Sequence, residues 1–502
     1  MEMRSAAPPH APGSGGAADA DADRTIRNVG VVVAQRGLHV LAALLFAAFV
    51  PRLLGPEIFG RYALLVSVSL WFALLSGLGA LSVMTRAVPK LVAEGDEAGV
   101  RRLATSLTAL RALTGPFAAA ACFGILAFVL REPDRLASAL VAGAIVFRTA
   151  ANVPYCLFLG LNDAGRWGMG ELIRRWATLA FVPAGFAAAG LRGACVGVVA
   201  AEAVVLGAGL WWARPYLRRS ALDLSRRSLG PVLRLGSSFA AGGLLAGLTQ
   251  RSGEVIVRLS TGRYEDVGFF GAAYAIYLTV SFALWNATFA CVPFIVGSIE
   301  RGRRADAAAW LERLLTYTAI AGAAGLAAAV VVGPDLVPFV LGRSYGPVAA
   351  TVVPLMAAIL VHGAGDVSRL LSLAVDRPHL IAAAAAIEFA AFWGLGLPLA
   401  SRAGSLGAAT AALAASVLYA AFLTWRARPT LPYSFAAAGR AVALAVVFVP
   451  AALIEWPWWG KAVMLAASLA AYAILLLRFG VVTRGELSEV RRLLRGWAAA
   501  RR

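Results

Sequence analysis

The sequence predicts an all-α polytopic membrane protein with about fourteen transmembrane helices. Of its 502 residues, 60% are hydrophobic and 15% are charged, and the mean hydropathy is +0.75. A soluble chain of this length needs more charge to cover its surface. The hydrophobic residues also fall in blocks of about 20, the length that crosses a bilayer as a helix. These observations exclude a soluble enzyme, a nucleic-acid-binding domain and a secreted disulfide-linked scaffold.

The chain begins with residues 1–24, mainly Ala, Gly, Pro and Asp, which predict a disordered tail. No hydrophobic stretch follows Met1 directly, so the first apolar run is expected to act as the insertion signal. Fourteen spans follow, the seventh interrupted by polar residues. Their expected ranges are 28–50, 62–84, 107–130, 136–159, 171–190, 193–213, 236–259, 268–296, 313–333, 348–368, 379–400, 405–425, 434–454 and 460–478.

The basic residues predict the orientation of these spans. With a cytoplasmic N-terminus, 32 Arg and Lys residues fall on the inner side and ten on the outer side. This asymmetry is typical of membrane proteins and places both termini in the cytoplasm. The net charge of +19 therefore reflects topology and not nucleic-acid binding. Only two of the 46 basic residues are Lys, and with the abundant Ala and Gly this favours a bacterial cytoplasmic (inner) membrane protein.

The spans are expected to form two parallel six-helix lobes around a central cavity, plus two C-terminal helices. The chain reads GPEIFGRYA near the second span and GRYEDVGFFG near the eighth, so Gly60 and Gly268 stand at the same place in successive sets of six spans. Because six is even, the halves run parallel, related by an axis along the membrane normal. Basic segments beside the spans are expected to contact anionic membrane lipids. The predicted parts after the tail are helices 1–6 (25–213), a basic connection (214–235), helices 7–12 (236–428), helices 13–14 (429–480) and a basic amphipathic cytoplasmic tail (481–502).

A motif over Pro51–Val92 reads LLG-x-x-x-FG-x-Y-A, followed by an apolar helix, GLG and Arg86. With stretches at 160–175, 267–276 and 341–360, it resembles the polysaccharide-biosynthesis, or oligosaccharide-repeat-unit, flippases of the multidrug/oligosaccharidyl-lipid/polysaccharide exporter superfamily. The resemblance covers residues 25–480. It implies an alternating-access carrier that moves an isoprenyl-diphosphate-linked oligosaccharide from the inner to the outer leaflet. Members often carry an Asp in span seven, where this chain has Glu254.

Polar residues inside the first-lobe spans are the candidate substrate-binding residues. A charge in hydrocarbon costs about 3 kcal/mol or more, so such residues usually face a cavity or a partner. Arg36 and Arg148 keep their charge when partly buried and suit a diphosphate. Gln35 and Asn152 add neutral polar groups. Arg148 is expected either to line the cavity or to form a buried pair with Glu202.

Polar residues in the second lobe are candidates for coupling to H⁺ or Na⁺. Glu254 and Arg251 lie three residues apart on one helical face, so they either neutralise each other or form a working site. Glu388 lies mid-span and is expected to be either buried and protonated or part of the coupling. Asp366 and Arg369 also share a face and predict a structural pair.

These observations favour a lipid-linked-oligosaccharide flippase for cell-surface polysaccharide synthesis, with a polysaccharide polymerase and glycosyltransferases as partners. The alternatives are a cation-coupled multidrug exporter of the same fold and a lipid-linked peptidoglycan-precursor flippase. Span one lacks the acid that drug exporters of this fold generally carry. A membrane enzyme is disfavoured because the loops leave no room for a catalytic site. The four Cys and four His residues show no metal-ligand spacing, and no cofactor is expected.

Overall fold

The computed structural model describes residues 14–77, 80–217, 222–225, 243–289, 291–454, 457–483 and 485–486. This part of the chain is almost wholly helical and contains no strand. The first lobe consists of α1 (Ser14–Ser76), α2 (Ala80–Ala93), α3 (Glu97–Gly124), the π-helix η1 (Ile125–Val129), α4 (Arg135–Gly160) and α5 (Ala164–Ala213).

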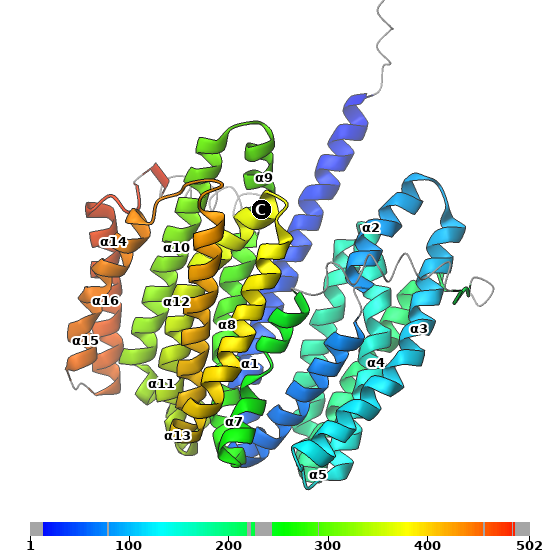
Figure 1. Ribbon diagram of the computed structural model, residues 1–502, viewed down its shortest axis with the longest axis horizontal. Coiled ribbons are helices and arrows are strands. Elements are labelled where there is room, and N and C mark those ends of the chain that lie inside the picture. The colour runs from blue at the N-terminus through cyan, green and yellow to red at the C-terminus, as the bar shows by residue number, and fades with distance from the viewer. Residues whose placement is uncertain are drawn as a thin grey trace, which may run out of the picture.

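The second lobe follows, with a C-terminal pair of crossings packed against it (Figure 1). Its helices are α7 (Gly253–Thr261), α8 (Tyr264–Phe289), α9 (Val292–Glu300), α10 (Arg304–Val331), α11 (Gly333–Leu341), η3 (Arg343–Tyr345), α12 (Gly346–Ala374) and α13 (Pro378–Ala427). The C-terminal pair consists of α14 (Ala436–Leu444), η4 (Ala445–Phe448), α15 (Val449–Leu453) and α16 (Trp458–Arg478).

Short polar signals in the sequence begin the first-lobe helices. The side chains of Asp96, Asp134 and Asp163 each accept a hydrogen bond from the backbone N–H three residues later, at 2.7, 3.0 and 3.0 Å. Each aspartate thereby satisfies an N–H group that the first helical turn leaves free. These caps fix where α3, α4 and α5 begin.

Ten helices in the described part of the chain are long and apolar enough to cross a membrane. Three of them, within α1, α5 and α13, contain 40, 50 and 50 residues, about twice one crossing. Each turns back at a glycine, Gly55, Gly190 or Gly404, and therefore crosses twice. That makes thirteen crossings, and α7 lies where the sequence predicts the interrupted seventh span. The predicted all-helical membrane fold is confirmed.

The turns in α5 and α13 need glycine because of their backbone angles. Gly190 has φ 56° and ψ −139°, and Gly404 has φ 56° and ψ −133°. A side chain would be strained in this conformation. The nearly identical angles, each in the middle of a double-length helix, show that the same turn occurs in both lobes.

Further left-handed residues show that the two lobes are copies of one topology. Asn162, two residues before α5, and Asp376, two residues before α13, have φ 59° and 53°. Gly95 in the α2–α3 connection and Gly302 in the α9–α10 connection have φ 71° and 74°. The weak sequence repeat is therefore a structural repeat of the parallel kind predicted.

The two glycines of the sequence repeat pack against each other. A β-carbon on Gly60 would lie 2.8 Å from the Gly268 nitrogen and collide with the Tyr264 carbonyl. A β-carbon on Gly268 would collide with the Pro56 carbonyl. Only glycine allows α1 and α8 to approach this closely. The two lobes therefore meet backbone to backbone at this point.

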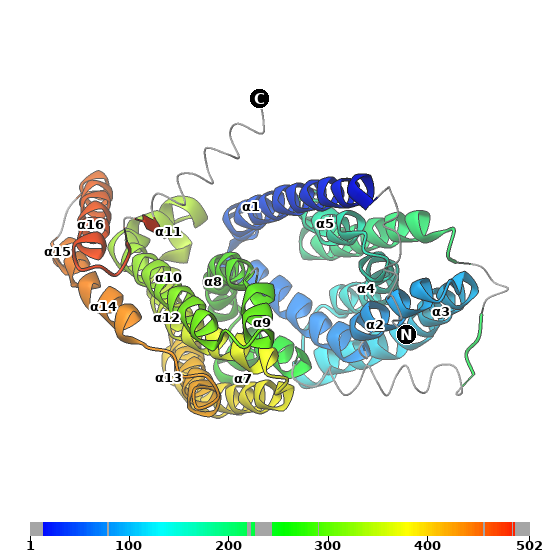
Figure 2. The same ribbon diagram turned by 90° about the horizontal axis from the view of Figure 1, so that it is seen from above.

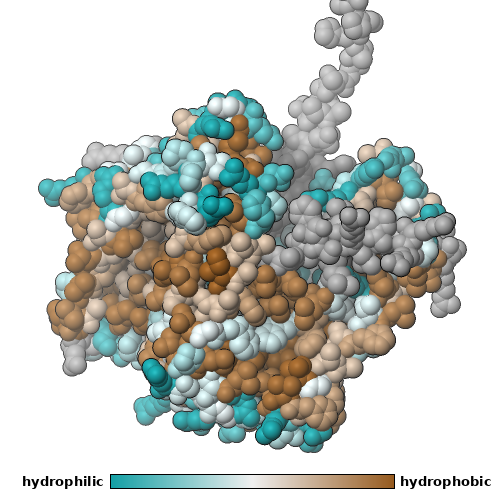
Figure 3. Space-filling view, viewed as in Figure 1, coloured by the Kyte–Doolittle hydropathy of each residue, from teal (hydrophilic) through white to brown (hydrophobic). Residues whose placement is uncertain are grey.

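Hydrophobic side chains gather over the middle of the face in Figure 3, and hydrophilic ones lie at its upper and lower ends. The α2–α3 and α9–α10 connections lie at the upper end in Figure 1, and the α7–α8 connection lies at the lower end. The charge pattern predicts the upper end to be cytoplasmic. The start of α1 and the end of α16 also lie there.

Reporter fusions test this orientation. We expect three fusion sites to report outside and three inside, because the basic connections stay on the cytoplasmic side. A reversal at two or more sites would contradict the topology. The outside sites are Asp134, Gly262 and Gly404, and the inside sites are Gly95, Arg226 and Gly302.

The structure describes only parts of the predicted N-terminal tail, the basic connection and the C-terminal tail. Helix α1 begins at Ser14, so residues 14–24 are helical, and the prediction of a disordered tail over 1–24 is wrong for this part. The alanines among these residues favour the helix, because Ala has the highest helix propensity. Most of the connection 214–235 and of the tail 481–502 lies outside the described residues.

Candidate functional site

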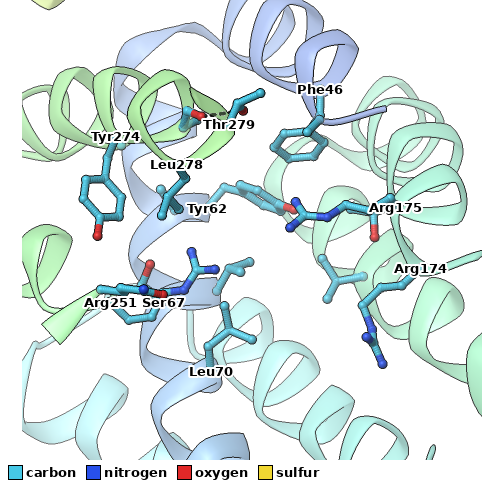
Figure 4. A pocket seen from close by; sticks show the side chains of 18 of the residues that line it. Phe46, Tyr62, Ser67, Leu70, Arg174, Arg175, Arg251, Tyr274, Leu278 and Thr279 are labelled. Atoms are coloured by element: carbon cyan, nitrogen blue, oxygen red, sulfur yellow. Dashed lines mark hydrogen bonds between the residues drawn. The ribbon is translucent and has the colours of Figure 1, made fainter. Parts of the chain in front are cut away.

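A cavity of about 330 Å³ lies between the two lobes. Both arms of α1, together with α4 and α5, form its first-lobe wall, and the turn before α7 and helix α8 form the second-lobe wall (Figure 4). Figure 2 shows these elements from above, with α1 and α8 side by side between the lobes. The titratable side chains that line the cavity are His39, Tyr62, Arg148, Glu171, Arg174, Arg175, Glu202, Arg251, Glu254 and Tyr274.

Arginines and glutamates form a connected network on the first-lobe wall. Arg148 donates to Glu202 at 2.7 Å, and Arg174 donates to both oxygens of Glu202 at 3.0 and 3.1 Å. Arg174 also donates to Glu171, and Arg175 lies 3.3 Å from Glu171. Three guanidinium groups thus face two carboxylates, which leaves one positive charge in excess.

Local sequence and the turn in α5 together build this network. Glu171, Arg174 and Arg175 are spaced i, i+3 and i+4, so they share one face of the first arm of α5. The turn at Gly190 brings Glu202 on the second arm back to Arg174. The side chain of Glu202 is 4% exposed and that of Arg148 is 32% exposed. The carboxylate is thus buried, and the Arg148 guanidinium is the more accessible partner.

The second-lobe wall contains a break in helical structure at residues 250–252, directly before α7. The Trp393 indole donates to the Ser252 hydroxyl at 3.0 Å, and the hydroxyl donates to the Leu248 carbonyl at 2.8 Å. The Trp71 indole donates to the same carbonyl at 3.3 Å. Non-helical backbone at membrane depth needs such partners, and it usually lines a cavity.

The break also decides how Arg251 and Glu254 lie. Both line the cavity, but no ion pair joins them within the described residues. Glu254 is buried, and one of its carboxylate oxygens has no hydrogen-bond partner there. Arg251 lies in the break and Glu254 lies in the first turn of α7, so the two residues do not share one continuous helix, and they contribute separately to the cavity lining.

The cavity contains some of the predicted site residues and not others. Arg148 lines it and also forms the predicted pair with Glu202. Gln35 donates instead to the Gly165 carbonyl at 2.8 Å, and neither it nor Asn152 belongs to the cavity lining. Arg36 lies in α1, but its side chain is outside the described part of the structure.

Glu388 lies away from the cavity, inside the second lobe. Its carboxylate is 3.7 Å from Nδ1 of His362 on α12. The predicted pair of Asp366 and Arg369 forms beside it, at 3.1 Å. Glu388 thus belongs to a second polar cluster, separate from the cavity lining.

Sequence reasoning missed Glu171, Arg174 and Arg175 as cavity residues. They stand at the expected start of span five, where charges are typical of a membrane boundary. Their spacing on one helix face was a signal for a network. Their place in the cavity depends on α5 beginning ahead of the predicted span, at its cap Asp163.

Known proteins resemble this chain in structure and not in sequence. No family model matches the sequence, and no curated protein matches it either. A structure described as "Lipid II flippase MurJ, inward closed conformation" is similar with a TM-score of 0.71 and 10% identity, covering 91% of this chain and 100% of that one.

Two structures of a multidrug resistance MATE family transporter of the MOP superfamily are also similar. The inward-facing one has a TM-score of 0.65 and 14% identity, covering 81% of this chain and 96% of that chain. The outward-facing one has a TM-score of 0.57 and 13% identity, covering 82% and 96%. The chain has the fold of these transporters. At such low identity the likeness establishes the fold alone, that of a multi-pass helical membrane protein.

Proposed function

We propose that this protein is a flippase for an isoprenyl-diphosphate-linked oligosaccharide, working by alternating access in the bacterial inner membrane. The main support for this proposal is the excess of arginine over glutamate among the residues that line the cavity. Guanidinium groups keep their charge when buried and bind phosphate oxygens in pairs. Arg148 is the natural contact for a diphosphate, because it is more exposed than Arg174 and because Arg174 continues to hold Glu202 when Arg148 turns to the cargo.

The same charge balance disfavours export of cationic drugs. The cavity lining holds four arginines against three glutamates. A cation would meet net repulsion in a partly desolvated space, where charge interactions are stronger than in water. A peptidoglycan-precursor flippase is the second candidate. It shares the diphosphate chemistry, and the similar MurJ structure bears the name of a lipid II flippase.

We place both termini in the cytoplasm and the cargo's entry on that side. Glycosyltransferases would supply the lipid-linked oligosaccharide there, and a polymerase would use it after transfer. The second lobe supplies a cation site for coupling to H⁺ or Na⁺, with Glu254 and Glu388 as the candidate acids. Their separate locations make the two candidates distinguishable by mutation.

Purified protein in liposomes tests the function. We expect it to move a lipid-diphosphate oligosaccharide to the opposite leaflet, measured by exposure of the sugar to a membrane-impermeant probe. A cationic dye should accumulate no faster than in empty liposomes. A lipid-linked disaccharide peptide, used as cargo in the same assay, tests the peptidoglycan-precursor candidate directly. Transport of the dye without transport of either lipid would contradict the proposal.

A further inference from the structure

The internal repeat relates the arginine network of the first lobe to the Glu388 cluster of the second. The sequence interval between the turns at Gly190 and Gly404 equals the interval between the left-handed Asn162 and Asp376. The starts of helices α5 and α13, which contain 50 residues each, are separated by the same interval. The register between α4–α5 and α12–α13 is therefore constant.

In this register, each arginine around Glu202 has a titratable counterpart in the second lobe. Arg148 corresponds to His362, and Arg174 corresponds to Glu388. Glu202 corresponds to Ser416, a buried residue without charge. The two lobes therefore hold a polar cluster at the same place in the fold, with different charge.

The second-lobe cluster is formed by three elements, α8, α12 and α13. The His362 ring stacks on Tyr419 of α13 with centroids 4.6 Å apart, and its Nδ1 has no hydrogen-bond partner among the described residues. Asp366 pairs with Arg369, whose guanidinium lies over the Trp285 ring of α8 at 5.6 Å. The titratable and charged groups that face Glu388 are His362, Asp366, Arg369, Tyr274, Tyr277 and Tyr419.

The charges of the two clusters have opposite sign. The first lobe has three arginines against two glutamates, all held in ion pairs. In the second lobe, Arg369 faces Asp366 and Glu388, which leaves one negative charge while His362 is neutral. One proton on His362 or Glu388 brings this cluster to zero. The charge of the arginine network stays fixed, because guanidinium remains protonated.

We propose that His362 and Glu388 form a proton-binding site, the charge-inverted copy of the anion site in the first lobe. This inference rests on the proposed transport function and names its coupling ion. A proton between Nδ1 and the carboxylate turns their 3.7 Å contact into a charge-assisted hydrogen bond. The imidazole favours a proton over Na⁺, because hard cations prefer a shell of oxygen ligands. In this proposal the Glu254 carboxylate lines the cavity and does not bind the coupling proton.

The consequence is a cluster whose charge depends on pH in the second lobe, and an arginine network of fixed charge at the equivalent place in the first lobe. When the proton leaves, the negative charge returns to the second lobe while the diphosphate site keeps its cations. The anionic cargo thus binds in the first lobe and the exchanged proton binds in the second, at equivalent positions in the fold. The two sites move with different lobes, as alternating access requires.

Infrared difference spectroscopy of the purified protein tests the site without any cargo. We expect one carboxyl band that titrates with pH in the wild type and is absent in Glu388→Gln. It should remain in the matched control Glu254→Gln. The variant His362→Arg places the first-lobe residue at the equivalent position and should abolish the titration while keeping an ion pair with Glu388.

Three results would overturn the proposal: a titration that persists in both Glu388→Gln and His362→Arg, one that disappears in Glu254→Gln, or a band that responds to Na⁺ at constant pH. In liposomes, His362→Arg should lose the acceleration of transport by a pH gradient. Failure of the wild type to move any lipid-linked sugar would contradict the proposed function, while the infrared result would still decide on the proton site.

Discussion

Replacing Arg148 with alanine is expected to lower transport about 10- to 100-fold while the protein still inserts and folds. A hydrogen bond to a charged group contributes about 1.5–3 kcal/mol, which corresponds to this range. The fold should tolerate the change because Glu202 keeps two hydrogen bonds from Arg174, at 3.0 and 3.1 Å. Arg148→Lys should recover part of the activity, since it keeps the charge and loses the paired donors.

The comparison variant is Arg174→Ala. Arg174 bridges Glu171 and Glu202 on the two arms of α5, and its side chain is 13% exposed. Its loss removes one partner from each of two carboxylates, so we expect a clear fall in thermal stability as well as in transport. Transport by leaflet exposure and unfolding by a thermal shift separate the two effects. Wild-type transport by Arg148→Ala would remove this residue from the cargo site.

Replacing Gly60 with leucine is expected to lower transport at least about 10-fold, since overpacking of this kind costs about 1–3 kcal/mol. The side chain would keep the lobes apart at the contact that the proposed topology places on the outer side. Even the first side-chain carbon would collide with the Tyr264 carbonyl and lie 2.8 Å from the Gly268 nitrogen. Both are backbone atoms, so one lobe must move. The state with the outer ends together is therefore disfavoured.

The accessibility of the cavity to a reagent added outside measures how far Gly60→Leu separates the lobes. With the four native cysteines replaced by alanine, a reporter cysteine at Ser67, which lines the cavity, should react faster with an outer impermeant maleimide in Gly60→Leu. The control is Gly394→Leu, because a β-carbon at Gly394 meets no atom within 4 Å. Equal labelling and equal transport in both variants would show that the glycine contact does not hold the outer ends closed.

Some properties of the fold follow from local sequence alone. Whether a stretch of about 20 apolar residues crosses the bilayer is determined by its own transfer free energy, which does not depend on the rest of the chain. The all-helical membrane fold and the Gly60–Gly268 repeat are therefore predictable without the structure. The pairs Arg148–Glu202 and Asp366–Arg369 are predictable too, the first from mid-span charges that need a partner and the second from helical spacing.

The candidate site depended on contacts between helices far apart in the sequence. Arg174 reaches Glu202 only because α5 turns back at Gly190, and Glu388 meets His362 only because α13 packs on α12. Sequence spacing placed Arg251 and Glu254 on one face of a continuous helix, but the structure has a break in the helix at 250–252. Composition determined that this chain crosses the membrane many times. The tertiary structure decided which charges meet. Side chains project from a helix in all directions, and only packing against other helices selects the face that lines a cavity.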